Sequence, residues 1–320
     1  MRIKGYLFFL FVAVWMLASR SSRPYQPPLS PAIFTPDGSS IIFSVARGDN
    51  CFLYQAEIAS GAVRRVTKAT SGCEFDPAIS PDGQQLAFMS APRPGEHAAL
   101  VIGKPDGTGI RTLVPNTEDN LKPVFVPHSK LILFLRSGAF EHYSPVVDNH
   151  RHKFDVFSVD TETGKINSIT EQKFYEINEI SVSADGKQLL VSVSTYPEGE
   201  HFLLEPVVQS STAVKSLQPS VPNSPQGAPI DYCAVWLPDG KSFLFYAATE
   251  PPGGGNFDYN VYRFTIASGI AEKLTQFSGM LDGFNVSPDG KKAVILRQGV
   301  YSILDLSTRK LTAVRLAESF

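Results

Sequence analysis

The sequence predicts an all-β protein, and within that class a six-bladed β-propeller of four-stranded antiparallel blades. A short apolar run ends six times in a Pro-Asp-Gly-like turn and restarts as a second apolar run, with copies that begin at Ala32, Ala78, Val124, Ile180, Ala234 and Phe284. Beyond the N-terminus, no stretch carries a sustained helical period. A repeat of this size indicates units that bury their apolar faces only against their neighbours.

The turns explain why each copy forms two antiparallel strands. Proline fixes φ, aspartate bonds its own backbone, and glycine adopts a positive φ without steric cost. The turn positions Asp37, Asp82, His128, Asp185, Asp239 and Asp289 follow at steps of 45, 46, 57, 54 and 50 residues. Such steps leave room for a third and a fourth strand in each unit. These are predicted at 52–58 with 63–67, 99–103 with 111–114, 156–159 with 166–170, 261–266 with 272–275, and 301–306 with 311–314.

The chain divides into three predicted segments. Arg2 and Lys4 precede the apolar run 6–18, so residues 1–21 are expected to be a signal peptide or an N-terminal anchor. Residues 22–31 contain several prolines and are expected to form an extended spacer before the propeller at 32–320. We therefore expect an exported protein, periplasmic or secreted. A membrane contact is expected only if the N-terminal segment stays uncleaved.

Cysteine is sparse, with Cys51, Cys73 and Cys233. Cys51 precedes a third strand and Cys73 precedes the next first strand, and loops of these two classes leave a propeller on the same side. In an oxidising compartment the two thiols could form a disulfide, and three isolated thiols are the alternative. Zinc binding is not expected, because no Cys-x-x-Cys pair occurs.

Charge and motifs exclude several functions. The formal net charge is −2, which gives no basic face for nucleic acid. No Gly-x-Ser-x-Gly elbow is present, and no residues are left over for a hydrolase domain. The run Gly253-Gly254-Gly255 lacks the Lys-Ser/Thr of a phosphate-binding loop.

Five of the six histidines are predicted in loops that join second to third strands, and therefore on one face of the propeller. Three of these follow a glutamate, as Glu96-His97, Glu141-His142 and Glu200-His201. The loop of the third unit adds His150 and His152, whose spacing on an extended segment points both rings to one side. These two are the candidate ligands of a divalent metal, and solvated loops are the alternative.

A second group of candidates is acidic. The segments that lead into first strands carry Glu74, Asp76, Glu118, Asp119, Glu176, Glu179, Asp231 and Asp282. First strands line a propeller's channel, so these carboxylates are expected around its mouth, where they could attract a basic peptide or a cation. The predicted partner-binding rim consists of these carboxylates except Glu176, together with Glu96, His97, Glu141, His142, Glu200 and His201.

The repeats also carry a family resemblance. The Ser-Pro-Asp-Gly pattern, with strand ends such as Lys273-Leu274-Thr275 and Lys310-Leu311-Thr312, resembles the propeller repeats of TolB-like proteins over about residues 31–315. Similar repeats occur in prolyl-oligopeptidase-like enzymes and in oligogalacturonate lyases. TolB carries an α/β domain before its propeller. Only about ten residues separate the predicted signal from the first unit here, so the chain resembles the TolB propeller alone.

Two functional classes remain open. The TolB resemblance implies a non-catalytic, exported propeller that binds a protein or peptide partner of the cell envelope on its loop-rich face and needs no cofactor. The lyase resemblance implies a metal-dependent carbohydrate lyase that uses His97, His142, His150, His152 and His201. Fold alone does not choose between the two.

Overall fold

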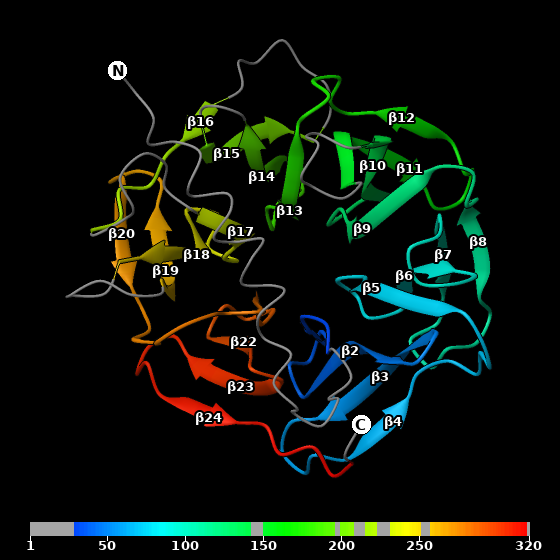
Figure 1. The fold of residues 1–320 in the computed structure, drawn as a ribbon, viewed down its shortest axis with the longest axis horizontal. Helices are drawn as coiled ribbons and strands as arrows, with labels where there is room; N and C mark the ends of the chain where they lie inside the picture. The colour runs from blue at the N-terminus through cyan, green and yellow to red at the C-terminus, as the bar shows by residue number, and fades with distance from the viewer. Residues whose placement is uncertain are drawn as a thin grey trace.

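The computed structural model describes residues 29–141, 150–195, 199–207, 215–222, 231–250 and 257–318. Within these ranges all regular structure is β-strand, and the sheets stand around a common axis (Figure 1). No helix of the described part is long and apolar enough to cross a membrane. The all-β prediction is therefore confirmed.

The strands follow the chain in groups of four. The first twelve are β1 (Ile33–Phe34), β2 (Ser40–Arg47), β3 (Asn50–Glu57), β4 (Val63–Arg65), β5 (Cys73–Ile79), β6 (Leu86–Ala91), β7 (Ala99–Gly103), β8 (Arg111–Val114), β9 (Asp119–Phe125), β10 (Leu131–Glu141), β11 (His150–Asp160) and β12 (Ile166–Ser168). The others are β13 (Glu176–Val182), β14 (Gln188–Thr195), β15 (Gly199–Pro206), β16 (Lys215–Leu217), β17 (Asp231–Trp236), β18 (Ser242–Thr249), β19 (Asp258–Thr265), β20 (Ile270–Lys273), β21 (Gly283–Val286), β22 (Lys292–Arg297), β23 (Val300–Asp305) and β24 (Leu311–Ala313).

Each group forms a four-stranded antiparallel unit. Strands β9–β12, β13–β16, β17–β20 and β21–β24 are separate sheets, whereas β1–β8 form one eight-stranded sheet. The two halves of that sheet are joined by a single parallel pair, Cys51 opposite Cys73. Figure 1 shows β5, β9, β13 and β17 facing the centre, with β4, β8, β12, β16, β20 and β24 at the periphery.

The core lies between neighbouring units. Each apolar cluster takes residues from neighbouring units, as in the cluster that contains Leu53 of β3 and Phe88 of β6. The cluster that contains Phe43 and Tyr301 joins the first unit to the last, and their ring centroids lie 4.9 Å apart. Because a sheet has two faces to bury, every unit depends on both of its neighbours.

The ring closes by packing and not by exchange of a strand. Strand β1 pairs with β2 and β24 pairs with β23, so both terminal units are built from one continuous segment. The C-terminal tail adds one backbone hydrogen bond, from Ala317 N to Gly61 O at 2.8 Å. A Cβ at Gly61 would lie 1.8 Å from the Arg315 carbonyl oxygen, so this crossing requires glycine.

The first unit begins earlier than the sequence predicts. Leu29 forms a bridge with Val45, and Ser30 N donates to Ser44 O at 3.1 Å. The Tyr301 hydroxyl of the last unit also donates to Ser30 O, at 2.6 Å. Residues 29–31 are therefore part of the propeller and not of an extended spacer, because Leu29 and Ser30 pair with β2 and the Ser30 carbonyl accepts from the last unit.

The tight turns between first and second strands share a side-chain hydrogen bond. In four of them a Ser or Thr hydroxyl donates to the turn aspartate, as from Ser287 to Asp289 at 2.6 Å. These hydrogen bonds, with a second from the backbone two residues on, lower the pKa values of Asp37, Asp82, Asp185 and Asp289 below the usual 3.8. The bonds stabilise the ionised carboxylates, so the turns are strongest where aspartate is charged.

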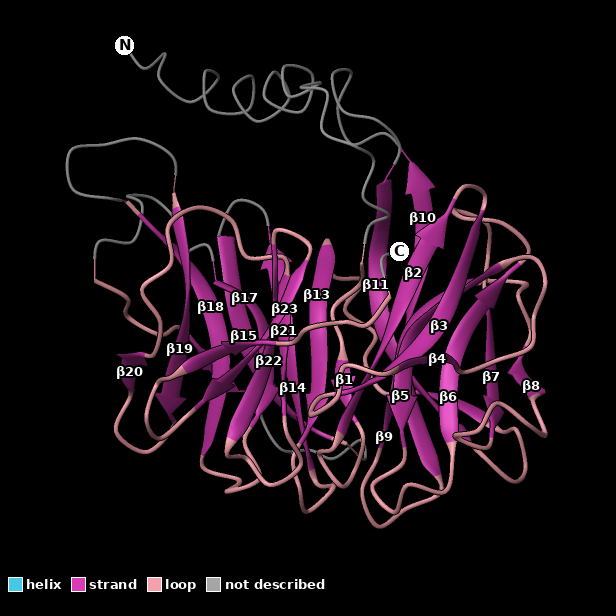
Figure 2. Cartoon of the chain, turned by 90° about the horizontal axis from the view of Figure 1, so that it is seen from below, coloured by secondary structure: helices cyan, strands magenta, loops and turns pink. Residues whose placement is uncertain are grey.

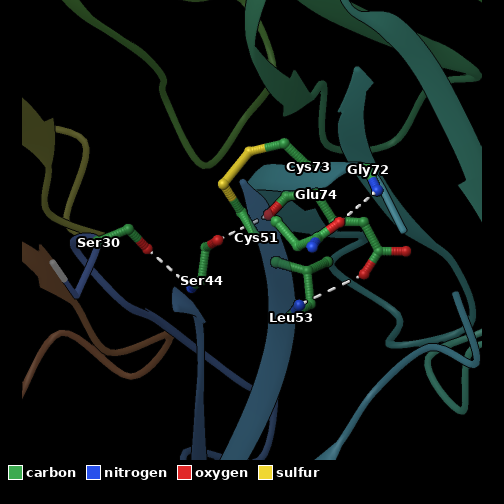
Figure 3. The surroundings of a disulfide bond; sticks show 8 residues. Ser30, Ser44, Cys51, Leu53, Gly72, Cys73 and Glu74 are labelled. Atoms are coloured by element: carbon green, nitrogen blue, oxygen red, sulfur yellow. Dashed lines mark hydrogen bonds between the residues drawn. A yellow bond between two sulfur atoms is a disulfide. The ribbon is translucent and has the colours of Figure 1, made fainter. Parts of the chain in front are cut away.

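A disulfide joins the first two units at their shared edge. The Cys51–Cys73 bond links β3 to β5, with the two Cα atoms 4.1 Å apart (Figure 3). Around it, the Ser44 hydroxyl donates to the Glu74 carbonyl at 2.6 Å, and Cys51 N donates to Gly72 O at 3.0 Å. Of the two alternatives that the sequence left open for Cys51 and Cys73, the structure has the bridge.

Replacing Cys51 and Cys73 together by alanine is expected to lower the free energy of unfolding by about 3 kcal/mol. The bridge closes a segment of 22 residues, whose entropy in the unfolded chain would otherwise be larger. Urea unfolding with and without a reductant measures this. A reductant should weaken the wild type and leave the double variant unchanged, and equal sensitivity of the two proteins would contradict the prediction.

The turn carboxylates predict a component of acid sensitivity. Because their pKa values are lowered in the folded state, their contribution is complete above the unfolded value of 3.8 and is lost as the pH falls below it. Asp289→Asn keeps an acceptor oxygen but cannot titrate. The unfolding free energy of this variant should therefore fall less steeply than that of the wild type between about pH 4 and pH 2. If the unfolding free energies of the two proteins fall in parallel as the pH is lowered, the Asp289 carboxylate does not contribute to acid sensitivity.

Candidate functional site: axial channel and loop-rich face

The first strands enclose a channel along the axis. A cavity of about 300 Å³ is lined by residues of β1, β5, β9, β13, β17 and β21. The six tight turns align these strands, because the first residue of each turn donates its N–H to an equivalent carbonyl five residues on. In each first strand, the residue four positions before the first residue of the turn therefore lies at the same height along the channel wall. These residues are Pro31, Asp76, Lys122, Glu179, Cys233 and Gly283. We call these six residues the polar ring.

Backbone irregularities help to set the conformation of the polar ring. The pairing of β5, β9 and β17 with the next strand shifts register at this level, and Asp76, Lys122 and Cys233 have φ values of 47°, 49° and 47°. Non-glycine residues rarely take these values, and bulges of this kind re-aim a side chain next to functional sites. The same local conformation therefore recurs in three units at the channel wall.

Charged groups of the ring are linked from one unit to the next. The Asp76 carboxylate accepts from the backbone N–H of Lys122 at 3.1 Å, and the Lys122 ammonium donates to Glu179 at 3.0 Å. Burial lowers the pKa of Lys122, but attraction to Glu179, Cys233 and Asp76 outweighs this effect and holds the pKa above its usual value. With 32 % of its side chain exposed, Lys122 carries a permanent positive charge inside the channel.

The predicted acidic residues separate into two kinds. Glu74 is buried and accepts from Thr67 at 2.6 Å and from Leu53 N at 3.4 Å, and Asp119 is buried and pairs with Arg151 at 2.5 Å. These two carboxylates therefore hold neighbouring strands together and do not face a partner. Glu118, Glu176 and Asp282 are exposed, whereas Asp76 and Glu179 belong to the channel wall. The side chain of Asp231, at the start of β17, lies outside the described part.

The predicted histidines are not gathered in loops. His97 is exposed beside Glu96 in the loop between β6 and β7, as expected. His150 and His152 instead lie in β11, and His201 lies in β15, because the strands extend further than the sequence indicated. His142 lies outside the described residues, as do the side chains of Glu141, His150, Glu200 and His201.

His152 has a structural environment. Its side chain is buried, its ring stacks on Tyr175 with centroids 4.6 Å apart, and its Nδ1 lies 3.3 Å from the Tyr175 carbonyl oxygen. Within the described residues, no group of three His, Cys, Asp or Glu side chains is placed to hold a metal ion. The imidazole of His152 is therefore enclosed beside Tyr175 and is not exposed at the rim.

The loop-rich face presents exposed apolar side chains. This face carries the loops from second to third strands and the connections between units, and in Figure 2 it is the side on which β2 and β10 end. Phe140 near the end of β10, Met280 before β21, and Val300 at the start of β23 are 60 %, 54 % and 49 % exposed. Sequence reasoning missed all three, because single apolar residues in loops and at strand ends carry no pattern that separates exposed from buried positions.

Replacing Glu74 by alanine is expected to reduce stability by about 1–3 kcal/mol, because the Leu53 N–H and the Thr67 hydroxyl would lose their acceptor in a buried place. Glu96→Ala is the matched control and should stay within about 0.5 kcal/mol of the wild type, because Glu96 is exposed. Thermal or urea unfolding distinguishes the two. Equal losses would mean that burial does not separate structural from surface carboxylates here.

Comparison with known proteins agrees with the geometry. No family model matches the chain. Dipeptidyl-peptidase 5 of Porphyromonas gingivalis is 26 % identical over 181 residues, which cover 51 % of this chain and 25 % of that protein. The chain thus spans about a quarter of the length of this curated relative.

Solved structures are similar over most of the chain. TolB of Agrobacterium tumefaciens has a TM-score of 0.61 and 18 % identity, over 85 % of this chain and 91 % of that one. An oligogalacturonate lyase in complex with manganese has a TM-score of 0.59 and 12 % identity, over 90 % and 85 % of the two chains. At these identities the similarity shows the fold: the chain folds as a β-propeller of the TolB type.

Proposed function

We propose that this protein is an exported six-bladed propeller that binds a protein or peptide partner on its loop-rich face, without catalysis. In this proposal residues 1–21 direct export or anchor the chain. Residues 22–28 form the spacer and the remainder forms the propeller. The disulfide supports export, because such bonds persist mainly in oxidising compartments.

The observation that carries the proposal is an exposed surface on the last unit, formed by Met280, Asp282 and Val300. The Asp282 carboxylate accepts from Gln298 N at 2.8 Å, which holds the connection before β21 against the hairpin between β22 and β23. That connection is also bound at its other end, where Gly279 N donates to Asp258 at 2.8 Å. Met280 and Val300 are thus held on backbone that is fixed on both sides.

This surface has the composition of an interface. Methionine is enriched where proteins bind one another, and a rim of charge around apolar residues is typical of such places. Exposed carboxylates such as Glu96, Glu118 and Glu176 and exposed cations such as Lys68, Arg93 and Lys173 share this face, so it offers a partner charges of both signs around the apolar residues. Phe140 provides a further exposed apolar side chain on the same face.

The test compares two faces of the same molecule. Met280→Asp with Val300→Asp changes the proposed surface. Ile270→Asp with Leu311→Asp changes equally exposed apolar residues that begin the outermost strands β20 and β24, next to the tight-turn side. A partner is first captured from an envelope extract by cross-linking, then identified and purified. Its binding to the wild type and to both variants is measured by calorimetry.

We expect the first variant to bind the purified partner at least about tenfold more weakly, and the second to bind within about twofold of the wild type. Equal effects of the two variants, or an effect of the second alone, would overturn the proposed surface. Stoichiometric manganese in the purified protein would overturn its non-catalytic part and favour the lyase alternative.

A further inference from the structure

The channel cavity lies on the side of the polar ring that faces the tight turns. Its wall begins at the ring residues Asp76, Lys122 and Glu179 and continues along the first strands to Phe34 and to Pro81 in a turn. The loop-rich face lies at the other end of the same strands. The cavity is therefore a separate place from the surface of Met280, Asp282 and Val300.

The charge of the cavity is unbalanced. Among the described residues that line it, only Asp76, Lys122 and Glu179 are charged. Two carboxylates against one ammonium leave a net charge of −1. An anion would meet this net repulsion, whereas one added positive charge would neutralise the ring. Walls of low dielectric constant strengthen that preference, since they focus the field along the channel.

Both carboxylates keep the capacity to accept further hydrogen bonds. A carboxylate has about four lone-pair positions on its two oxygens. Asp76 uses Oδ2 for the Lys122 N–H, and Glu179 uses Oε2 for the Lys122 ammonium and Oε1 for Ile180 N. An incoming ammonium with three N–H donors can therefore bond to either carboxylate without displacing Lys122.

Below the ring, each first strand contributes one half-buried aliphatic side chain to the wall. These are Ile33, Ile79, Val124, Val182, Val235 and Val286. They offer apolar contact around the axis, in a cavity whose volume of about 300 Å³ is at the lower end for small-molecule sites. The cavity thus has a negatively charged end at the polar ring and an apolar wall along the rest of its length.

We propose that this channel binds a primary ammonium carried on an unbranched aliphatic chain, with Asp76 and Glu179 accepting from the ammonium and the six aliphatic side chains contacting the chain. A free alkylamine has this chemistry, and so does a lysine side chain of a partner. The inference does not depend on the surface proposed above, because it concerns the opposite end of the channel.

The probe is hexylammonium, with hexanoate and hexan-1-ol as matched ligands of the same length. Titration of the full-length protein at pH 7, followed by calorimetry or by chemical-shift changes, should show binding of the amine only. Glu179→Gln and Asp76→Asn remove one charge each and keep an acceptor oxygen. Each should weaken hexylammonium binding by at least about tenfold.

Two further variants control for unrelated effects. Glu176→Gln removes an exposed carboxylate from the same strand as Glu179, outside the cavity, and should leave binding within about twofold of the wild type. Lys122→Met removes the competing ammonium and should tighten binding. If that variant does not fold, the two carboxylate variants still decide, with their melting temperatures recorded as a check on the fold.

Three results would overturn the proposal: hexan-1-ol or hexanoate binding as tightly as the amine, equal losses in Glu176→Gln and Glu179→Gln, or no binding of hexylammonium. A peptide with one central lysine, compared with the same peptide carrying norleucine there, distinguishes the two sources. Binding of the lysine peptide would assign the site to a partner, and binding of the free amine alone to a small molecule. Failure here leaves the comparison of the Met280 and Ile270 variants unaffected.

Discussion

Burial between neighbouring sheets is the constraint on which the rest of this structure depends. A four-stranded sheet that stood alone would leave both of its apolar faces in water. Here Leu53 packs on Phe88 of the next unit, and Phe43 packs on Tyr301 of the last. Because each unit needs two neighbours, the sheets must form a closed ring. That closure brings one residue from every first strand to a shared level of the axis, so the polar ring is a consequence of packing between the units.

Much of the architecture follows from the sequence, because its signals are local. The Pro-Asp-Gly turns and the alternating apolar runs predict first and second strands close to their observed positions. The third strand of the fourth unit is harder to predict, because the sequence of β15 contains Glu200, His201 and Glu205 and does not resemble a strand. It forms because β14 offers it a paired edge along its whole length. The extension of β10 and β11 has the same origin, and it moves His152 from an expected loop into a buried strand.

The functional residues were only partly predictable, because burial is set by contacts between units. Glu74 and Glu179 both belong to first strands, yet Glu74 is enclosed by Thr67 and Leu53 while Glu179 faces the channel. Residue type does not separate them, whereas distance from the turn does, because Glu179 lies four residues before its turn and Glu74 six. The position of Asp76, Lys122 and Glu179 at one level could have been found by counting four residues back from each turn. The left-handed conformation of Asp76 and Lys122 could not, since neither residue type demands it.

The disulfide between Cys51 and Cys73 makes the ring mechanically uneven. Consecutive units are joined by the chain itself, and the first two also by sulfur. The junction of the last unit with the first has no covalent link in the described structure and is held by the apolar cluster around Phe43 and Tyr301 and by hydrogen bonds such as that from Ala317 to Gly61. In a propeller built in this way, the first and last units would separate before any other pair. Thermal motion that widens the channel would therefore begin at that junction.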